Sequence, residues 1–455
     1  LTDGCSITAQ GARITSDGTY QDITQSGALV IGDTYEMEYE ITESVSGSIS
    51  VTTSFGSGIV LKTTVGVHKF YAVAIQTFLQ VKRSTACDIT IDNIKIKRLN
   101  GDDTPRIDYT DGGCPVLLTE PQSTNLQKLS NDLTQSRAYT DATIASNDTT
   151  SPDGNINADK VVEGSLLSAH GFRDNPNVAA TIGEDYTLSF FAKASERHLI
   201  SISNAAEGSA AARFNLTNGT ITAEGATITA KMDDYGNGWY RCSISGTSTT
   251  TISQMNIKIA AVETGSLTYQ GDGVSGLYIW GCQTEALGYP TSYIPTYGAV
   301  RTRLQDTVKG AGTSSDFNDS EGVLFAEISA LADDGTYRLI AISDGTSSNR
   351  VFIGYSSVSN TISARVQDTG GAQPIITYAV ADTSIPQKIA LKYKLNDVAL
   401  WVNGIEVATE TVSDVPLNLN TATFTSGSSS SVFYGKTSQV QVFKTALSDF
   451  ELTQL

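Results

Sequence analysis

The stretch that decides the fold spans residues 186–193 and reads Tyr186-Thr187-Leu188-Ser189-Phe190-Phe191-Ala192-Lys193. A short, largely apolar run bounded by turn residues predicts a β-strand. The tract around it, residues 125–306, repeats this pattern, because short apolar segments such as residues 277–280 alternate with turns rich in glycine. We therefore predict sheets built from many short strands.

The strictest alternation lies earlier in the chain, at residues 35–41, where Tyr35, Met37, Tyr39 and Ile41 alternate with Glu36, Glu38 and Glu40. Such alternation predicts a strand with one buried face and one wet face. Residues 182–186 parallel residues 31–35, and an alternating strand follows each. Residues 91–94 and 277–280 have the form of equivalent last strands. The pattern indicates two divergent copies of one β module.

The C-terminal third of the chain carries strand patterns at residues 325–328, 338–342, 388–393 and 399–402. Asn403-Gly404 predicts a type I′ hairpin turn, which needs positive φ at both central residues. Ser448-Asp449-Phe450-Glu451 is a capping-box pattern that predicts a short C-terminal helix.

Proline and glycine punctuation between residues 100 and 124 marks a connector. We therefore predict an all-β chain of tandem β-sandwich, jelly-roll modules with a short C-terminal helix. The predicted boundaries are a β-sandwich at 1–99, a linker strap at 100–124, a jelly roll at 125–306 and a second type of sandwich at 307–455.

Several motifs carry a family resemblance: Asn125-Leu126, Ser151-Pro152-Asp153-Gly154, Gly238-Trp239-Tyr240-Arg241 and residues 289–296. With them, residues 125–306 resemble the carbohydrate-binding-module-like jelly rolls of bacteriophage tail and fibre proteins. Residues 400–404 and 441–448 resemble the laminin-G or concanavalin A-like sandwich. That second resemblance implies binding of glycans or proteins at loop ends, sometimes through calcium.

The composition excludes several classes of protein. A chain of 455 residues exceeds one ordinary domain, and its net charge of −18 disfavours nucleic acid as a partner. No apolar run approaches the roughly 20 residues of a membrane helix. Five cysteines without Cys-x-x-Cys spacing predict free thiols and synthesis in a reducing cytoplasm. A first residue of Leu1 predicts a processed or partial chain.

No catalytic signature is present. The three histidines, His68, His170 and His198, lack metal-ligand spacing, and no Gly-x-Ser-x-Gly elbow occurs. The acid pairs at residues 102–103, 233–234 and 333–334 lie in predicted turns, where Asp side chains bond the nearby backbone. We predict no catalytic residues and no organic cofactor.

Asp92 is the one candidate metal ligand, and it rests on the resemblance. Jelly rolls of this kind often hold a structural calcium through backbone carbonyls and a carboxylate near the last strand, and Asp92 resembles that carboxylate. Hard oxygen ligands on turns suit calcium. The alternative is that Asp92-Asn93 forms an ordinary bulge or edge.

Sugar recognition usually needs an exposed aromatic ring that stacks on a pyranose. The three tryptophans, Trp239, Trp280 and Trp401, lie in or beside apolar strands, which predicts core packing. Tyrosines in predicted turns are the alternative platforms: Tyr20, Tyr235, Tyr289, Tyr293, Tyr355 and Tyr378. We take Tyr235, Tyr355 and Tyr378 as the candidate glycan-binding residues.

The resulting hypothesis is a non-enzymatic phage virion component, namely a fibre, tail or capsid-decoration protein on the virion surface. It would bind host cell-surface polysaccharide, contact other virion proteins and form a homo-oligomer, most often a trimer in fibres. Two alternatives stay open. One is a polysaccharide-degrading lyase or glycosidase with binding modules, and the other is a structural spacer or decoration protein without a ligand.

Overall fold

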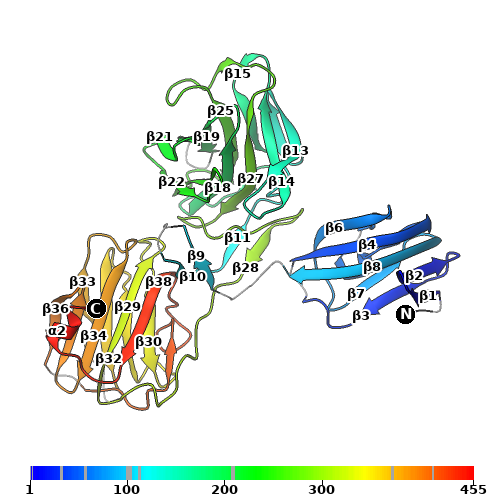
Figure 1. The fold of residues 1–455 in the computed structure, drawn as a ribbon. Helices are drawn as coiled ribbons and strands as arrows, with labels where there is room; N and C mark the ends of the chain where they lie inside the picture. The colour runs from blue at the N-terminus through cyan, green and yellow to red at the C-terminus, as the bar shows by residue number, and fades with distance from the viewer. Residues whose placement is uncertain are drawn as a thin grey trace. The chain divides into compact units, whose positions relative to one another are not determined.

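The structure is a computed structural model, and it describes residues 2, 4–30, 34–55, 59–98, 105–110, 114–205, 211–369, 374–411 and 414–455. Almost all regular structure among them is β-sheet, as predicted, and the two helices are four residues long (Figure 1). No helix of the described part has the length and apolar character needed to cross a bilayer. The chain divides into two compact units, Leu1–Gly101 and Asp102–Leu455.

The N-terminal unit consists of two antiparallel sheets around one core. Its sheets have the strand orders β1-β2-β8-β4-β6 and β3-β7-β5. The elements are β1 (Cys5–Thr8), β2 (Gly11–Ser16), β3 (Asp22–Gln25), β4 (Thr34–Ser46), β5 (Ile49–Ser50), α1 (Thr52–Phe55), β6 (Gly66–Val73), β7 (Leu79–Arg83) and β8 (Cys87–Arg98).

Strand β4 confirms the alternation found in the sequence, because Tyr35, Met37, Tyr39 and Ile41 are all at most 5% exposed. Strand β5 is only two residues long. It ends at Ser50, and the chain turns into α1, which carries Phe55 into the core. The buried hydroxyl of Ser54 accepts a hydrogen bond from the Gln80 amide at 2.8 Å, and this contact holds the turn against β7.

The middle module extends from β11 (Ser123–Asn125) to β28 (Arg301–Arg303), which pair with each other. Two six-stranded sheets, β12-β16-β25-β19-β20-β21 and β13-β14-β27-β18-β23-β22, enclose its core. The other elements are β12 (Arg137–Thr140), β13 (Ala142–Thr150), β14 (Ile156–Glu163), β15 (Leu167–Ser168), β16 (His170–Asp174), β17 (Val178–Ala179), β18 (Asp185–Ala194), β19 (Leu199–Asn204), β20 (Ala211–Asn215), β21 (Thr220–Glu224), β22 (Thr229–Asp234), β23 (Trp239–Thr247), β24 (Ile252–Ser253), β25 (Met255–Ala260), β26 (Tyr269–Gln270) and β27 (Gly276–Glu285).

The C-terminal module has a seven-stranded sheet, β36-β35-β34-β29-β38-β10-β9, and a five-stranded sheet, β33-β32-β31-β30-β37. Two strands of the predicted strap, β9 and β10, belong to the larger sheet. The elements are β9 (Arg106–Asp108), β10 (Val116–Thr119), β29 (Glu321–Ala330), β30 (Arg338–Ser343), β31 (Arg350–Tyr355), β32 (Thr361–Gln367), β33 (Ile376–Ala379), β34 (Gln387–Lys394), β35 (Val398–Val402), β36 (Ile405–Glu410), β37 (Thr421–Thr423), β38 (Gly435–Phe443) and α2 (Asp449–Leu452).

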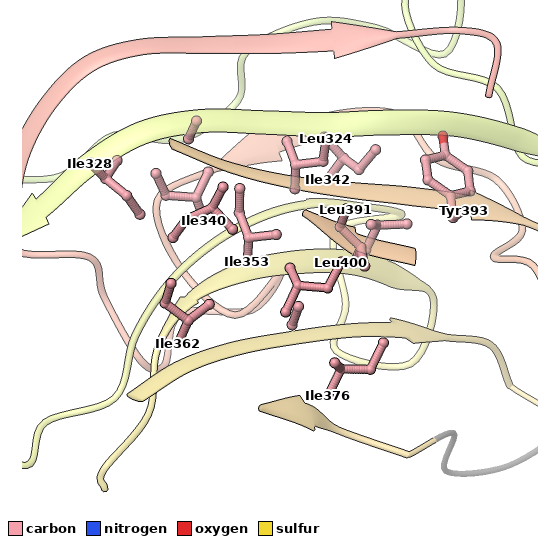
Figure 2. Packing of buried hydrophobic residues seen from close by; sticks show 14 of the residues in the cluster. Leu324, Ile328, Ile340, Ile342, Ile353, Ile362, Ile376, Leu391, Tyr393 and Leu400 are labelled. Atoms are coloured by element: carbon pink, nitrogen blue, oxygen red, sulfur yellow. The ribbon is translucent and has the colours of Figure 1, made fainter. Parts of the chain in front are cut away.

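Apolar side chains from both sheets fill the space between them in this module. Figure 2 shows Leu324, Leu391 and Leu400 of the larger sheet facing the isoleucines of the smaller one. The local predictions here are confirmed, since Asn403 and Gly404 both have positive φ, at 51° and 77°. Ser448 and Glu451 form the predicted capping box at α2.

A network of four charged side chains ties the ends of the middle module to the strap. Arg106 Nη2 donates to Asp306 Oδ2 at 2.7 Å and to Glu120. Arg303 contacts the same two carboxylates, Glu120 at 3.3 Å and Asp306 at 3.6 Å. The two acids are at most 3% exposed, so both depend on these arginines for their charge compensation.

The N-terminal unit and the middle module share a local device. The amide of Val30 donates to the Tyr35 hydroxyl at 2.9 Å, and the amide of Thr181 donates to the Tyr186 hydroxyl at 3.0 Å. In both cases the strand that contains the tyrosine pairs across a bulge with a strand late in its module, β4 with β8 and β18 with β27. Residues 31–33, part of the sequence parallel, lie outside the described residues.

Candidate functional site

The three candidate tyrosines lie in different environments. Tyr355 is 2% exposed and its hydroxyl donates to the Ile328 carbonyl at 2.8 Å. Burial raises its pKa well above the ordinary value. Its prediction as a platform is therefore corrected: β31 points it inward on the same face as Val351 and Ile353, so no ligand reaches its ring.

Tyr378 is 38% exposed and lies on β33, an edge strand of the five-stranded sheet. It stands opposite Ile362, a core residue of the neighbouring strand. Tyr378 and Tyr235 belong to different modules, so the structure does not unite the predicted residues in one site.

Tyr235 lies in the tight turn between β22 and β23, and the residue is 40% exposed. The next three residues, Gly236, Asn237 and Gly238, all have positive φ, between 54° and 78°. Asp234 Oδ1 accepts from the Gly236 amide at 2.7 Å, and the Tyr235 amide donates to the Trp239 carbonyl at 2.9 Å. The turn thus fixes the position of the ring. Its hydroxyl has no hydrogen-bond partner among the described residues.

Tyr235 belongs to a cluster of side chains around Phe191. We call it the Phe191 cluster and define it as Phe191, Tyr235, Trp280, Tyr293 and Arg241. The ring of Tyr235 meets Phe191 edge to face, with centroids 4.8 Å apart and planes at 86°. The ring centroids of Trp280 and Tyr293 lie 5.1 Å and 6.0 Å from that of Phe191. The guanidinium of Arg241 lies 5.4 Å from the Phe191 centroid. Tyr235 is the member that offers most of its ring to solvent.

The tryptophans are buried, as predicted: Trp239, Trp280 and Trp401 are 2%, 5% and 6% exposed. Trp239 Nε1 donates to the Thr150 carbonyl at 3.1 Å, whereas Nε1 of Trp280 and of Trp401 has no hydrogen-bond partner within the described ranges of the chain. They stiffen the outer faces of their sheets and offer no stacking surface.

Asp92 lies at a surface pocket of about 350 Å³ in the N-terminal unit. The hairpin of β1 and β2 and the bulge at residues 91–94 of β8 form its walls. Glu40 stands opposite Asp92, but its carboxylate accepts from the Asn93 side chain at 2.7 Å. No group of three or more His, Cys, Asp or Glu side chains in the described part of the chain is placed to hold an ion. Calcium, which takes 6–8 oxygen ligands, stays a prediction here.

A polar cluster surrounds Glu163 in the middle module. Arg197 donates from Nε to Glu163 Oε2 at 2.8 Å and from Nη2 to Oε1 at 2.5 Å. The Tyr269 hydroxyl and the Asp272 amide donate to the same carboxylate, at 2.5 Å and 3.0 Å. Burial raises the pKa of Glu163, but the donors outweigh it and the net pKa is lowered. A carboxylate held ionised by four donors is a structural anchor and not a proton carrier.

The remaining polar candidates serve the fold. His170 is fully buried and lies between the backbone carbonyls of Asp141 and Tyr269, at 2.9 Å and 3.1 Å. His68 Nε2 lies 2.5 Å from the Thr64 carbonyl oxygen. Asp234 and Asp334 accept from backbone amides two residues further on, as predicted for turns. Asp233 instead lies on β22 and pairs with Lys231, and Asp333 accepts from Ser359 and Asn360. Residues 102–103 lie outside the described residues.

One basic pair escaped the sequence analysis: Arg350 on β31 and Arg365 on β32. They lie on the outer face of the five-stranded sheet, away from the main core. The signal for it was available, because Arg350 alternates with Val351 and Ile353, and Arg365 with Ala364 and Val366. What the sequence could not show is that the two strands pair and bring these charges together.

Comparison with known proteins bears mainly on the C-terminal module. Residues 325–453 match the family model described as concanavalin A-like lectin/glucanases superfamily, Laminin_G_3. This match supports the concanavalin A-like sandwich predicted there. None of the curated proteins compared with the chain matches it.

Three solved structures give similarities. A Bacteroides ovatus protein described as carbohydrate-binding is 13% identical over 60% of this chain and 79% of its own, with a TM-score of 0.25. The CBM22-1-CBM22-2 tandem domain of Paenibacillus barcinonensis Xyn10C is 13% identical over 61% and 94%, with a TM-score of 0.23. Domains LG4-5 of the mouse laminin alpha1 chain are 11% identical over 77% and 100%, with a TM-score of 0.21. Values this low do not transfer a function to this chain.

Proposed function

We propose that this protein binds glycans without chemical turnover, and that Tyr235 is the stacking platform of the middle module. One observation carries the proposal: an exposed ring is held in one orientation by a rigid turn and by Phe191, and its hydroxyl is free to bond a ligand. An aromatic ring of this kind can stack on the apolar face of a pyranose while its polar rim bonds hydroxyls.

We propose further that the protein is a phage virion component at the virion surface, which binds host cell-surface polysaccharide and contacts other virion proteins. The motifs of residues 125–306 support this assignment. A single tyrosine platform gives weak binding, so function would rely on several copies, as in a trimeric fibre. A non-catalytic role agrees with the Glu163 cluster, whose groups are engaged with one another.

The test is a glycan array with the full chain, followed by the variant Tyr235→Ala. We expect the variant to lose binding by about tenfold or more, taking the stacking of a pyranose on one ring as comparable to the about 1–3 kcal/mol of a stacked base. Tyr109→Ala is the matched control, because Tyr109 is 70% exposed and is not one of the candidate platforms. Equal binding by Tyr235→Ala and the wild type would refute the platform.

Two further outcomes bear on the wider proposal. No binding of any host polysaccharide, even by an oligomeric form, would refute glycan binding. Release of reducing ends or of unsaturated products from a bound polysaccharide would refute the non-catalytic assignment and favour the degrading enzyme.

A further inference from the structure

The five-stranded sheet of the C-terminal module carries two arginines side by side on its outer face. Phe352 pairs with Arg365, and Arg350 pairs with Gln367, so the two arginines are diagonal neighbours on adjacent strands. Diagonal neighbours in an antiparallel pair lie about 7–8 Å apart at their backbones, within reach of long side chains. The sheet therefore concentrates two positive charges in a chain whose net charge is −18.

Arg365 has neither a hydrogen-bond partner nor an ion-pair partner in the described part of the chain. Its Nε is buried and unsatisfied, while the side chain as a whole is only partly buried. The terminal nitrogens, equally without a partner, therefore face solvent. A guanidinium presents its donors as a planar fork that matches a carboxylate, sulfate or phosphate group.

Arg350 is held in place beside it. Its Nε and Nη2 donate to Gln367 Oε1 at 3.1 Å and 3.0 Å, and its Nη1 donates to the Ser426 carbonyl. The guanidinium lies 4.9 Å from the centroid of the Phe352 ring. These partners are all neutral, so they orient the charge of Arg350 without compensating it.

Two further observations favour an anionic ligand at this position. Ser363, two residues before Arg365 on the same face of β32, is fully buried, and its hydroxyl has no hydrogen-bond partner among the residues that the structure describes. Burial lowers the pKa of Arg365, while burial and then the charge of Arg365 lower the pKa of Arg350. No carboxylate contributes to either shift. Arg197, by contrast, has the carboxylate of Glu163 against it.

We propose that Arg350 and Arg365, with Ser363 beside them, form a binding site for the anionic group of an acidic saccharide. The chemistry selects a carboxylate or a sulfate ester, because each offers oxygens that can accept from both guanidinium groups. Such a ligand supplies a negative charge, which no carboxylate of the described chain provides to these two arginines. The site is separate from Tyr235, which lies in the middle module.

The experiment measures dissociation constants of the full chain by isothermal titration calorimetry. The probes are an oligogalacturonate, a dextran sulfate, neutral dextran and inorganic sulfate. We expect the two charged saccharides to bind, and Arg365→Gln to weaken that binding about tenfold or more, which corresponds to about 1.4 kcal/mol. Because this arginine has no partner, the variant should fold normally, which a thermal melt verifies.

Arg173→Gln is the matched control, since it removes one charge from an exposed arginine of the middle module, and we expect it to change binding less than about twofold. Inorganic sulfate that competes as well as the saccharides would confirm the anion site but overturn its assignment to a saccharide. Failure of both charged saccharides to bind the wild type, or unchanged binding by Arg365→Gln, would overturn the proposal. A loss in Arg365→Gln that is confined to the charged saccharides and spares any binding of neutral ones distinguishes this site from Tyr235, so the two sites can fail separately.

Discussion

Arg197 in the middle module and Arg365 in the C-terminal module are both partly buried, yet their charges meet opposite surroundings. Arg197 donates twice to the buried carboxylate of Glu163 and stacks 5.4 Å from the centroid of Tyr269. Its pKa is raised, first by the hydrogen bond to Glu163. Arg365 has no acid, and burial lowers its pKa. Burial of a charge is costly unless it is paired, so the charge of Arg197 is compensated within the fold, whereas that of Arg365 is the one we propose for a ligand.

The largest effect on the free energy of unfolding should come from breaking the ion pair of Glu163 and Arg197. Glu163→Gln removes the carboxylate that four donors share and leaves Arg197 without a counter-charge. Loss of one partner from a buried ion pair costs about 3–5 kcal/mol of unfolding free energy. Urea denaturation of the variant and the wild type measures it. Glu184→Gln, at an exposed position, should change stability by less than about 0.5 kcal/mol, and a similarly small effect at position 163 would contradict the structural role.

Acid should remove the same interaction. The folded-state pKa of Glu163 lies below its ordinary value, so its contribution is complete above about pH 4.3 and is lost as the pH falls through the lowered pKa. The difference in unfolding free energy between the wild type and Glu163→Gln should therefore be largest near neutrality and shrink below about pH 4. Other carboxylates also titrate in this range, such as Asp159, whose pKa is raised by burial. They are present in both proteins, so their contributions cancel in the difference. A constant difference over this range would refute the assignment.

Substitution of the unpaired Arg365 should change stability in the opposite direction. Arg365→Gln removes a charge that burial disfavours and that repels Arg350, so stability should be unchanged or rise by about 1 kcal/mol. Arg197→Gln is the matched comparison and should destabilise, because it leaves the Glu163 carboxylate buried without its arginine. A thermal melt of both variants decides between them. Marked destabilisation by Arg365→Gln would show that the fold already satisfies this arginine.

The same contrast explains what the sequence could and could not predict. Alternation located β4 and its buried face, and the Asn403-Gly404 and Ser448-Glu451 patterns located a hairpin and a helix, because each signal is local. The charge pairs depend on long-range register: Glu163 and Arg197 lie 34 residues apart. Sequence patterns do not encode which strands become neighbours. For that reason they could not separate the paired arginine from the unpaired one.

Tyr355 illustrates the same limit. A tyrosine near a predicted turn fits either an exposed platform or the end of a buried strand, and only the register of β31 against β30 and β32 decides. Tyr235 was correctly located in a turn by the glycines around it. Its exposure and its contact with Phe191, however, depend on β18, which lies more than forty positions earlier in the sequence.

The smallest effect concerns two buried serines that differ only in their partners. Ser123 Oγ donates to Glu285 Oε1 at 2.6 Å, whereas Ser363 Oγ has no partner although the residue is fully buried. Ser123→Ala should cost about 1.5–3 kcal/mol, the range for hydrogen bonds to charged groups, while Ser363→Ala should leave stability unchanged or raise it by less than about 1 kcal/mol. Because both substitutions delete one oxygen, the difference isolates the hydrogen bond. If Ser363→Ala is as harmful as Ser123→Ala, the hydroxyl already has a partner in the fold; if it is harmless and weakens binding of the charged saccharides, the oxygen belongs to the ligand site.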